Sequence, residues 1–152
     1  MKYINKILEY LLFVMLAVMA FSMATNVFCR SLLGFSISWA DELCQSLLVW
    51  VTFLGAAIAV RENLHYSFNY LLQVLKGRNR TILLLFNDLV ILFCAVYMLF
   101  DGVRITRGIA GWLMPAMGIS RAWVYGACPV GCALIILYCA TDIVQQFKSS
   151  RV

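Results

Sequence analysis

Hydrophobic residues in this sequence fall into four long runs in which charged residues are rare. The runs cover residues 7–29, 43–60, 81–100 and 122–141. A bilayer core about 30 Å thick takes roughly 20 apolar residues of α-helix at about 1.5 Å rise each. The pattern therefore predicts an all-α integral membrane protein, residues 1–152, with four transmembrane helices in a single membrane domain.

The segment between the second and third runs has a different, two-faced pattern. Over residues 62–76, polar side chains alternate at helical spacing with five large apolar ones, namely Leu64, Phe68, Leu71, Leu72 and Leu75. Such a helix is too short to span a bilayer and is typical of one that lies along its surface. We expect an amphipathic interfacial helix here, on the cytoplasmic side.

Composition and charge further restrict the class of protein to which this chain can belong. The chain is 64% hydrophobic and 12% charged, with a mean hydropathy of +0.90, which excludes an ordinary soluble domain. The net charge of +5 comes from basic residues at the ends of the apolar runs, so we expect phospholipids and not nucleic acid as contacts. Eight of the twelve lysines and arginines lie at the N-terminus, between the second and third runs, and at the C-terminus. Because basic residues concentrate on the cytoplasmic side of a membrane, this distribution predicts both termini in the cytoplasm.

Catalytic groups are missing from the pattern. The six cysteines lie in or at the edge of the apolar runs without a Cys-x-x-Cys pair, and His65 is the only histidine. This argues against a thiol oxidase, a bis-histidine haem anchor or a histidine-ligated zinc site. Cys128 and Cys132 share a helical face, but buried small hydrophobes are the favoured interpretation. We expect no enzyme activity, and no metal or cofactor in this chain.

Several local features inside the runs carry structural expectations. Asp88 is costly at bilayer depth, which favours a hydrogen bond to a neighbouring helix or a partner subunit over a proton relay with Glu9 and Asp142. Gly55 and Gly131 each belong to a small-x-x-x-small pattern that permits close helix approach. Pro129 predicts a kink in the fourth helix. The third helix can extend to residue 107, because Asp101, Arg104 and Arg107 recur every three residues.

Short motifs in a specific order resemble those of a known family. They are Asn26-x-x-x-Arg30, the segment Ser38-Trp39-Ala40-Asp41-Glu42, the segment from Trp50 to Gly55, and Arg61-x-x-x-His65. In this order they resemble the small four-helix permease subunit of tripartite ATP-independent periplasmic (TRAP) transporters. Asp41 stands where that family more often has glutamate.

The resemblance implies a scaffold role in the bacterial inner membrane, as a subunit separate from its partner. A large subunit would carry the substrate and sodium sites and move as an elevator in symport. A periplasmic binding protein would deliver an organic acid such as sialic acid or a dicarboxylate. Candidates for the partner interface are Asn26, Arg30, Trp39, Asp41, Glu42, Trp50, Gly55, Arg61, His65 and Asp88. Candidates for an outer docking surface are Asp101, Arg104, Arg107 and Arg121.

Asp41 and Glu42 allow two interpretations. They can act as acids in the first turn of a helix capped by Ser38. They can also anchor that helix to cations, either Arg30 or basic groups of the large subunit, and this second interpretation is slightly favoured. Two other functions stay open for the whole chain: a self-assembling small four-helix exporter, and a membrane anchor subunit of another complex.

Overall fold

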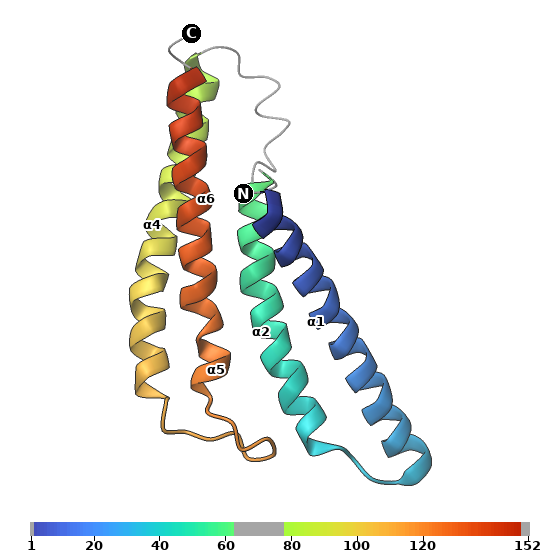
Figure 1. Cartoon of the computed structure of the whole chain (residues 1–152). Coiled ribbons are helices and arrows are strands. Elements are labelled where there is room, and N and C mark those ends of the chain that lie inside the picture. The colour runs from blue at the N-terminus through green and yellow to red at the C-terminus, as the bar shows by residue number, and fades with distance from the viewer. Residues whose placement is uncertain (1, 63–77, 150–152) are drawn as a thin grey trace.

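The computed structural model describes residues 2–62 and 78–149, and within these residues the chain is helical apart from its connections (Figure 1). Helix α1 (Lys2–Phe28) continues into a π-helical turn, η1 (Cys29–Leu33), and α2 covers Ser38–Arg61. Then come α4 (Arg78–Gly108), the short α5 (Ala122–Tyr125) and α6 (Ala127–Ser149).

Four helical segments are long and apolar enough to cross a membrane. They are Lys6–Leu33, Ser38–Arg61, Leu85–Gly108 and Ala122–Thr141, which confirms the predicted all-α class with four spans. The predicted interfacial helix at 62–76 lies, apart from Glu62, outside the described residues.

The spanning helices stand in an open row in the order α1, α2, α6, α4 (Figure 1). Helix α2 packs between α1 and α6, and α6 packs between α2 and α4. Within the described residues, α1 packs against α2 alone among the spanning helices. The row therefore leaves each end helix with one neighbour.

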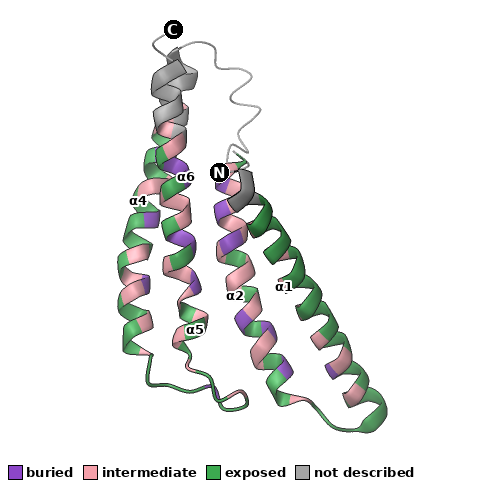
Figure 2. Cartoon of the chain, in the orientation of Figure 1, coloured by how far each residue is buried: buried purple, intermediate pink, exposed green. Residues whose placement is uncertain are grey.

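Helix α1 contacts α2 along a narrow stripe. The half-buried or buried positions recur every three or four residues, as at Leu12, Met15, Met19, Ser22 and Asn26. This spacing is that of a single helix–helix seam. The rest of α1 is exposed, and Figure 2 shows most of the helix in the exposed colour.

Two glycines set the distances between the other helices. A Cβ atom on Gly131 of α6 would lie 2.7 Å from the Cβ of Phe53 on α2. A Cβ on Gly102 of α4 would lie 2.9 Å from the Sγ of Cys128 on α6. At Gly131 the neighbouring atoms include the backbone of Phe53, so only a residue without a side chain allows this approach, whereas at Gly102 the nearest atom is the side-chain sulfur of Cys128. Gly55, from the other small-residue pattern, has no atom within 4 Å of such a Cβ.

Two helix ends differ from the expectations. Helix α2 starts at Ser38, ahead of the apolar run at 43–60, with Asp41 in its first turn as expected. Ser38 does not cap it, because the capping position is Ile37, without a side-chain hydrogen bond. The last span is interrupted at Gly126, between α5 and α6, and not at Pro129. Pro129 lies in the first turn of α6, where its missing N–H would have no helical acceptor.

Candidate functional site at the two ends of the helix row

Polar contacts gather at the two ends of the row. We call the end that carries the connections 34–37 and 109–121 the loop end, and the opposite end, with Glu9 and Arg61, the terminal end (Figure 1).

Asn26 joins α1 to the start of α2 at the loop end. Its Nδ2 donates to Asp41 Oδ1 at 3.0 Å, and its Oδ1 accepts from the backbone N–H of Ile37 at 2.8 Å. An amide suits this position because it offers a donor and an acceptor together. The Asn26 side chain is therefore a staple across the 34–37 turn.

Glu42 joins the start of α2 to the connection between α4 and α5. Its carboxylate oxygens accept from the backbone N–H of Ala116 at 3.0 and 3.1 Å, and Oε2 also accepts from Met117 at 2.8 Å. Hydrogen bonds to a charged group are stronger than those between neutral groups. Glu42 thus fixes a loop that is more than seventy residues away in sequence.

The connection held by Glu42 has its own backbone order. The N–H of Met114 donates to the carbonyl of Ile119 at 2.8 Å, and the N–H of Gly118 donates back to Met114 at 2.8 Å. Gly118 has φ of +67°, a value that suits glycine. Met114 is buried and approaches Ser46 of α2. The loop is therefore a compact cap on the end of α2.

Two tryptophans add an aromatic contact near the same end. The Nε1–H of Trp50 on α2 donates to the carbonyl of Trp123 on α5 at 3.1 Å. The two rings lie 5.5 Å apart at a tilt of 43°, which is within the range of favourable aromatic pairs. Trp50 thereby fixes the position of α5 relative to α2.

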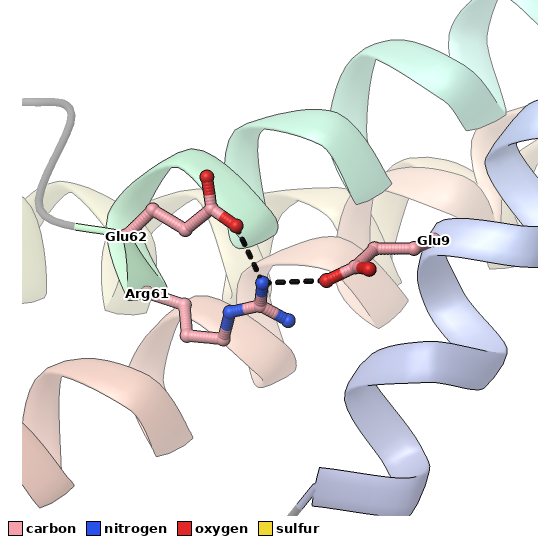
Figure 3. Close-up of polar contacts among 3 residues, drawn as sticks. All are labelled: Glu9, Arg61 and Glu62. Carbon is pink, nitrogen blue, oxygen red and sulfur yellow. Dashed lines mark hydrogen bonds and ion pairs between the residues drawn. The ribbon is translucent and has the colours of Figure 1, made fainter.

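Arg61 organises the terminal end (Figure 3). Its Nη2 lies 2.7 Å from Glu9 Oε1 on α1 and 2.6 Å from Glu62 Oε1. The Arg61 side chain is only 17% exposed, and its buried Nη1 has no hydrogen-bond partner within the described residues. The contact closes the α1–α2 seam at the end opposite Asn26.

The structure separates the three acids of the relay hypothesis. Asp88 is 4% exposed. Ala95 and Gly102 follow it at intervals of seven residues, so all three lie on the same side of α4, the side that packs against α6. Glu9 lies on α1, which is not a neighbour of α4. The side chain of Asp142 lies outside the described residues. Glu9 and Asp88 therefore lie on helices that are not neighbours in the row.

The remaining candidates are less closely connected. Asp41 contacts the Asn26 amide, and the ion pairs among the described side chains involve Arg61 and not Arg30. Trp39 is exposed, as are Arg30, Arg104, Arg107 and Arg121. His65 lies outside the described residues. Over the described part of the chain, no group of three or more potential ligands gathers that could hold a metal ion.

Sequence reasoning missed the partners of Glu42. They are main-chain N–H groups of Ala116 and Met117, and a backbone donor carries no residue-type signature. It also missed Gly102, whose spacing to Thr106 is a further small-x-x-x-small pattern that was not singled out.

These features define a multi-pass membrane protein whose polar residues serve helix-to-helix contacts, and comparison with known proteins identifies its family. A family model for the DctQ component of tripartite ATP-independent periplasmic transporters matches residues 19–149. The chain belongs to this family. It is therefore a transport component of the bacterial inner membrane and not an enzyme.

Curated relatives agree with this assignment. The chain is 28% identical to the sialic acid TRAP transporter permease protein SiaT of Haemophilus influenzae, with 99% of this chain and 24% of SiaT covered. It is 29% identical to a TRAP transporter small permease protein of the same species, with 94% of this chain and 89% of the relative covered. It is 30% identical to the C4-dicarboxylate TRAP transporter small permease protein DctQ of Rhodobacter capsulatus, with coverage of 69% and 47%. The chain thus spans about a quarter of SiaT but most of the small permease protein.

Proposed function

We propose that this chain is the small scaffold subunit of a TRAP transporter that supports a large, sodium-coupled elevator subunit. A periplasmic binding protein delivers the substrate, and sodium binds to the large subunit. Membership of the DctQ family supports the proposal, as does the match of this chain to a quarter of the larger permease SiaT.

One observation carries the scaffold role: α1 is packed on one side only. Its outward face presents a stripe of aromatic side chains, and Tyr10, Phe13 and Phe21 are 71%, 69% and 76% exposed. On the same face, Ala17 lies between Phe13 and Phe21, and Ala24 follows Phe21. Aromatic rings alternating with alanines form a ridged surface into which another helix can pack. We assign this face of α1 to the large subunit.

The loop end provides the surface for the binding protein in this proposal. Both termini lie in the cytoplasm, so the loop end faces the periplasm, and Arg104, Arg107 and Arg121 are exposed there beside Asp101. Glu42 keeps the 109–121 connection in a fixed shape through its backbone contacts. A preorganised loop docks a partner at a lower entropic cost than a free one.

The substrate class follows from the relatives. The names of two of them specify sialic acid and C4-dicarboxylates. Both are organic acids with a carboxylate. We therefore propose uptake of an organic acid of this kind, with no substrate or cofactor site in this chain.

Co-purification tests the scaffold role. The tagged chain is co-expressed with the large permease subunit of its transporter, and both are extracted in mild detergent. Phe21→Ala on the α1 face should reduce recovery of the large subunit several-fold. Phe93→Ala is a matched control, because Phe93 on α4 is similarly exposed, at 74%.

The two other candidate functions predict different results. A self-assembling exporter would be recovered only with copies of itself, and an anchor of another complex with unrelated soluble subunits. Equal recovery of the large subunit with both phenylalanine variants would refute the assignment of the α1 face while leaving the family membership intact.

A further inference from the structure

A groove runs between α2 and α4 because both helices pack extensively against α6 and, within the described residues, have no comparable contact with one another. One cavity of about 300 Å³ lies between Val49 and Phe53 of α2 and Tyr97 and Ile105 of α4, with Cys128 of α6 at its floor. A second cavity of about 320 Å³ continues toward the loop end. Val49 and Tyr125 line both cavities, so the two form one continuous groove.

The groove has the length of one lipid leaflet. It extends along α2 from Glu42 to Phe53, which is about 16 Å of helix at about 1.5 Å per residue. Half of a bilayer core is about 15 Å thick. With Glu42 at the level of the lipid headgroups, a groove of this length ends near the middle of the membrane.

The deep part of the groove is apolar, and its mouth carries both signs of charge. Asp101 is the only carboxylate that lines the deep cavity. Arg121, Glu42 and Gln45 line the outer cavity. An arginine binds phosphate through its planar fork of N–H donors. A carboxylate has about four acceptor sites, and the backbone N–H groups of Ala116 and Met117 use three.

We propose that this groove binds a phospholipid with a zwitterionic, primary-amine headgroup, of the phosphatidylethanolamine class. One acyl chain lies along Val49 and Phe53, the phosphate contacts Arg121, and the ammonium group contacts Glu42 with Gln45 beside it. A headgroup with phosphate alone would leave the carboxylate facing an anion. A quaternary amine would bring no N–H donor to it.

The size of the groove favours a lipid chain over a partner helix. A helix of this length, about 10–12 Å across, occupies on the order of 1,200 Å³. That volume is about twice the combined volume of the two cavities. Hydrocarbon, in contrast, enters narrow apolar grooves without bringing polar groups that need partners.

Native mass spectrometry tests the proposal on the full-length chain, extracted together with any subunit that co-purifies. After removal of loosely bound lipid, phosphatidylethanolamine, phosphatidylcholine and phosphatidylglycerol are added at equal concentration. Wild type should retain one phosphatidylethanolamine with at least fivefold preference over the other two. This headgroup comparison needs no variant.

Two pairs of variants locate the site. Val49→Phe fills the groove where the two cavities join and should reduce retained phosphatidylethanolamine at least fivefold. Leu48→Phe is its control, because Leu48 is exposed on α2 outside the groove. Arg121→Gln should abolish the headgroup preference, whereas Arg104→Gln, another exposed arginine outside the lining, should not. Circular dichroism checks that each variant keeps its helix content.

Three outcomes would overturn the proposal. They are equal retention of the three lipids by wild type, equal lipid retention by Val49→Phe and Leu48→Phe, and loss of the large subunit instead of the lipid in Val49→Phe. The last result would assign the groove to a protein partner. The first two leave the scaffold role untouched, since its own test is the phenylalanine pair, whereas the third would move the interface with the large subunit from the α1 face to the groove.

Discussion

Replacing Gly131 by alanine should separate α2 from α6, because this glycine makes the closest approach between the two helices. The new Cβ would lie 2.7 Å from the Cβ of Phe53 and 3.0 Å from its backbone oxygen. Neither atom can move without moving α2, so the clash is not relieved by a rotamer change. Overpacking of this kind costs typically about 1–3 kcal/mol. Alanine regains about 0.5–1 kcal/mol of helix propensity over glycine, which leaves a net destabilisation centred near 1 kcal/mol, within about 0–2.5 kcal/mol.

Gly55→Ala provides the matched control, since both residues are glycines inside spanning helices. Its Cβ meets no atom within 4 Å, so the helix-propensity gain stands alone and the isolated chain should be as stable as wild type or slightly more so. Reversible unfolding in mixed micelles, followed by circular dichroism, measures both variants. If Gly131→Ala is as stable as wild type, or if Gly55→Ala lowers the stability as much as Gly131→Ala does, Gly131 is not required for the close approach of α2 and α6.

Three further substitutions address the polar contacts at the ends of the row. Asn26→Leu removes both hydrogen bonds across the 34–37 turn and should cost about 1–3 kcal/mol, measured by the same unfolding assay; an unchanged midpoint would show that the staple is dispensable. Glu42→Ala leaves the N–H groups of the 109–121 connection without their acceptor and should raise proteolysis at that loop several-fold, whereas Arg30→Ala should not; equal cleavage would argue against Glu42 as its anchor. Arg61→Gln removes a partly exposed ion pair worth about 0.2–1 kcal/mol and should loosen the terminal ends of α1 and α2. A cysteine cross-link between these ends should then form faster but with less specificity for one pair of positions. An unaltered cross-linking rate would count against this role of Arg61.

The spanning helices were predictable because their signal is local. Each apolar run is long enough to span by itself, and hydropathy needs no knowledge of neighbouring helices. The apolar run of the second span begins only at residue 43 because Asp41 and Glu42 are charged, and it was this acid pair that indicated the first turn of α2 ahead of the run. Acids in a first helical turn are nonetheless favourable, since they face the positive end of the helix dipole.

The order of the helices in the row was not predictable in the same way. Lipid is as apolar as the side chains, so an apolar face does not reveal whether lipid or protein covers it. Gly55 and Gly131 illustrate this limit. Both belong to small-x-x-x-small patterns, but only Gly131 touches a neighbouring helix in this chain. The partners of Glu42 stayed hidden because main-chain groups look alike in every sequence.

An open row divides the stability of the molecule into separate nearest-neighbour terms. No single helix takes part in all three of the seams, which are α1–α2, α2–α6 and α4–α6. In a closed bundle, by contrast, the helices pack around a common core. Substitutions in the α1–α2 seam and in the α4–α6 seam are then far enough apart for their free-energy changes to add. A variant that loosens α1 leaves the other three helices in register, so the array comes apart from its ends inward and not as one cooperative unit.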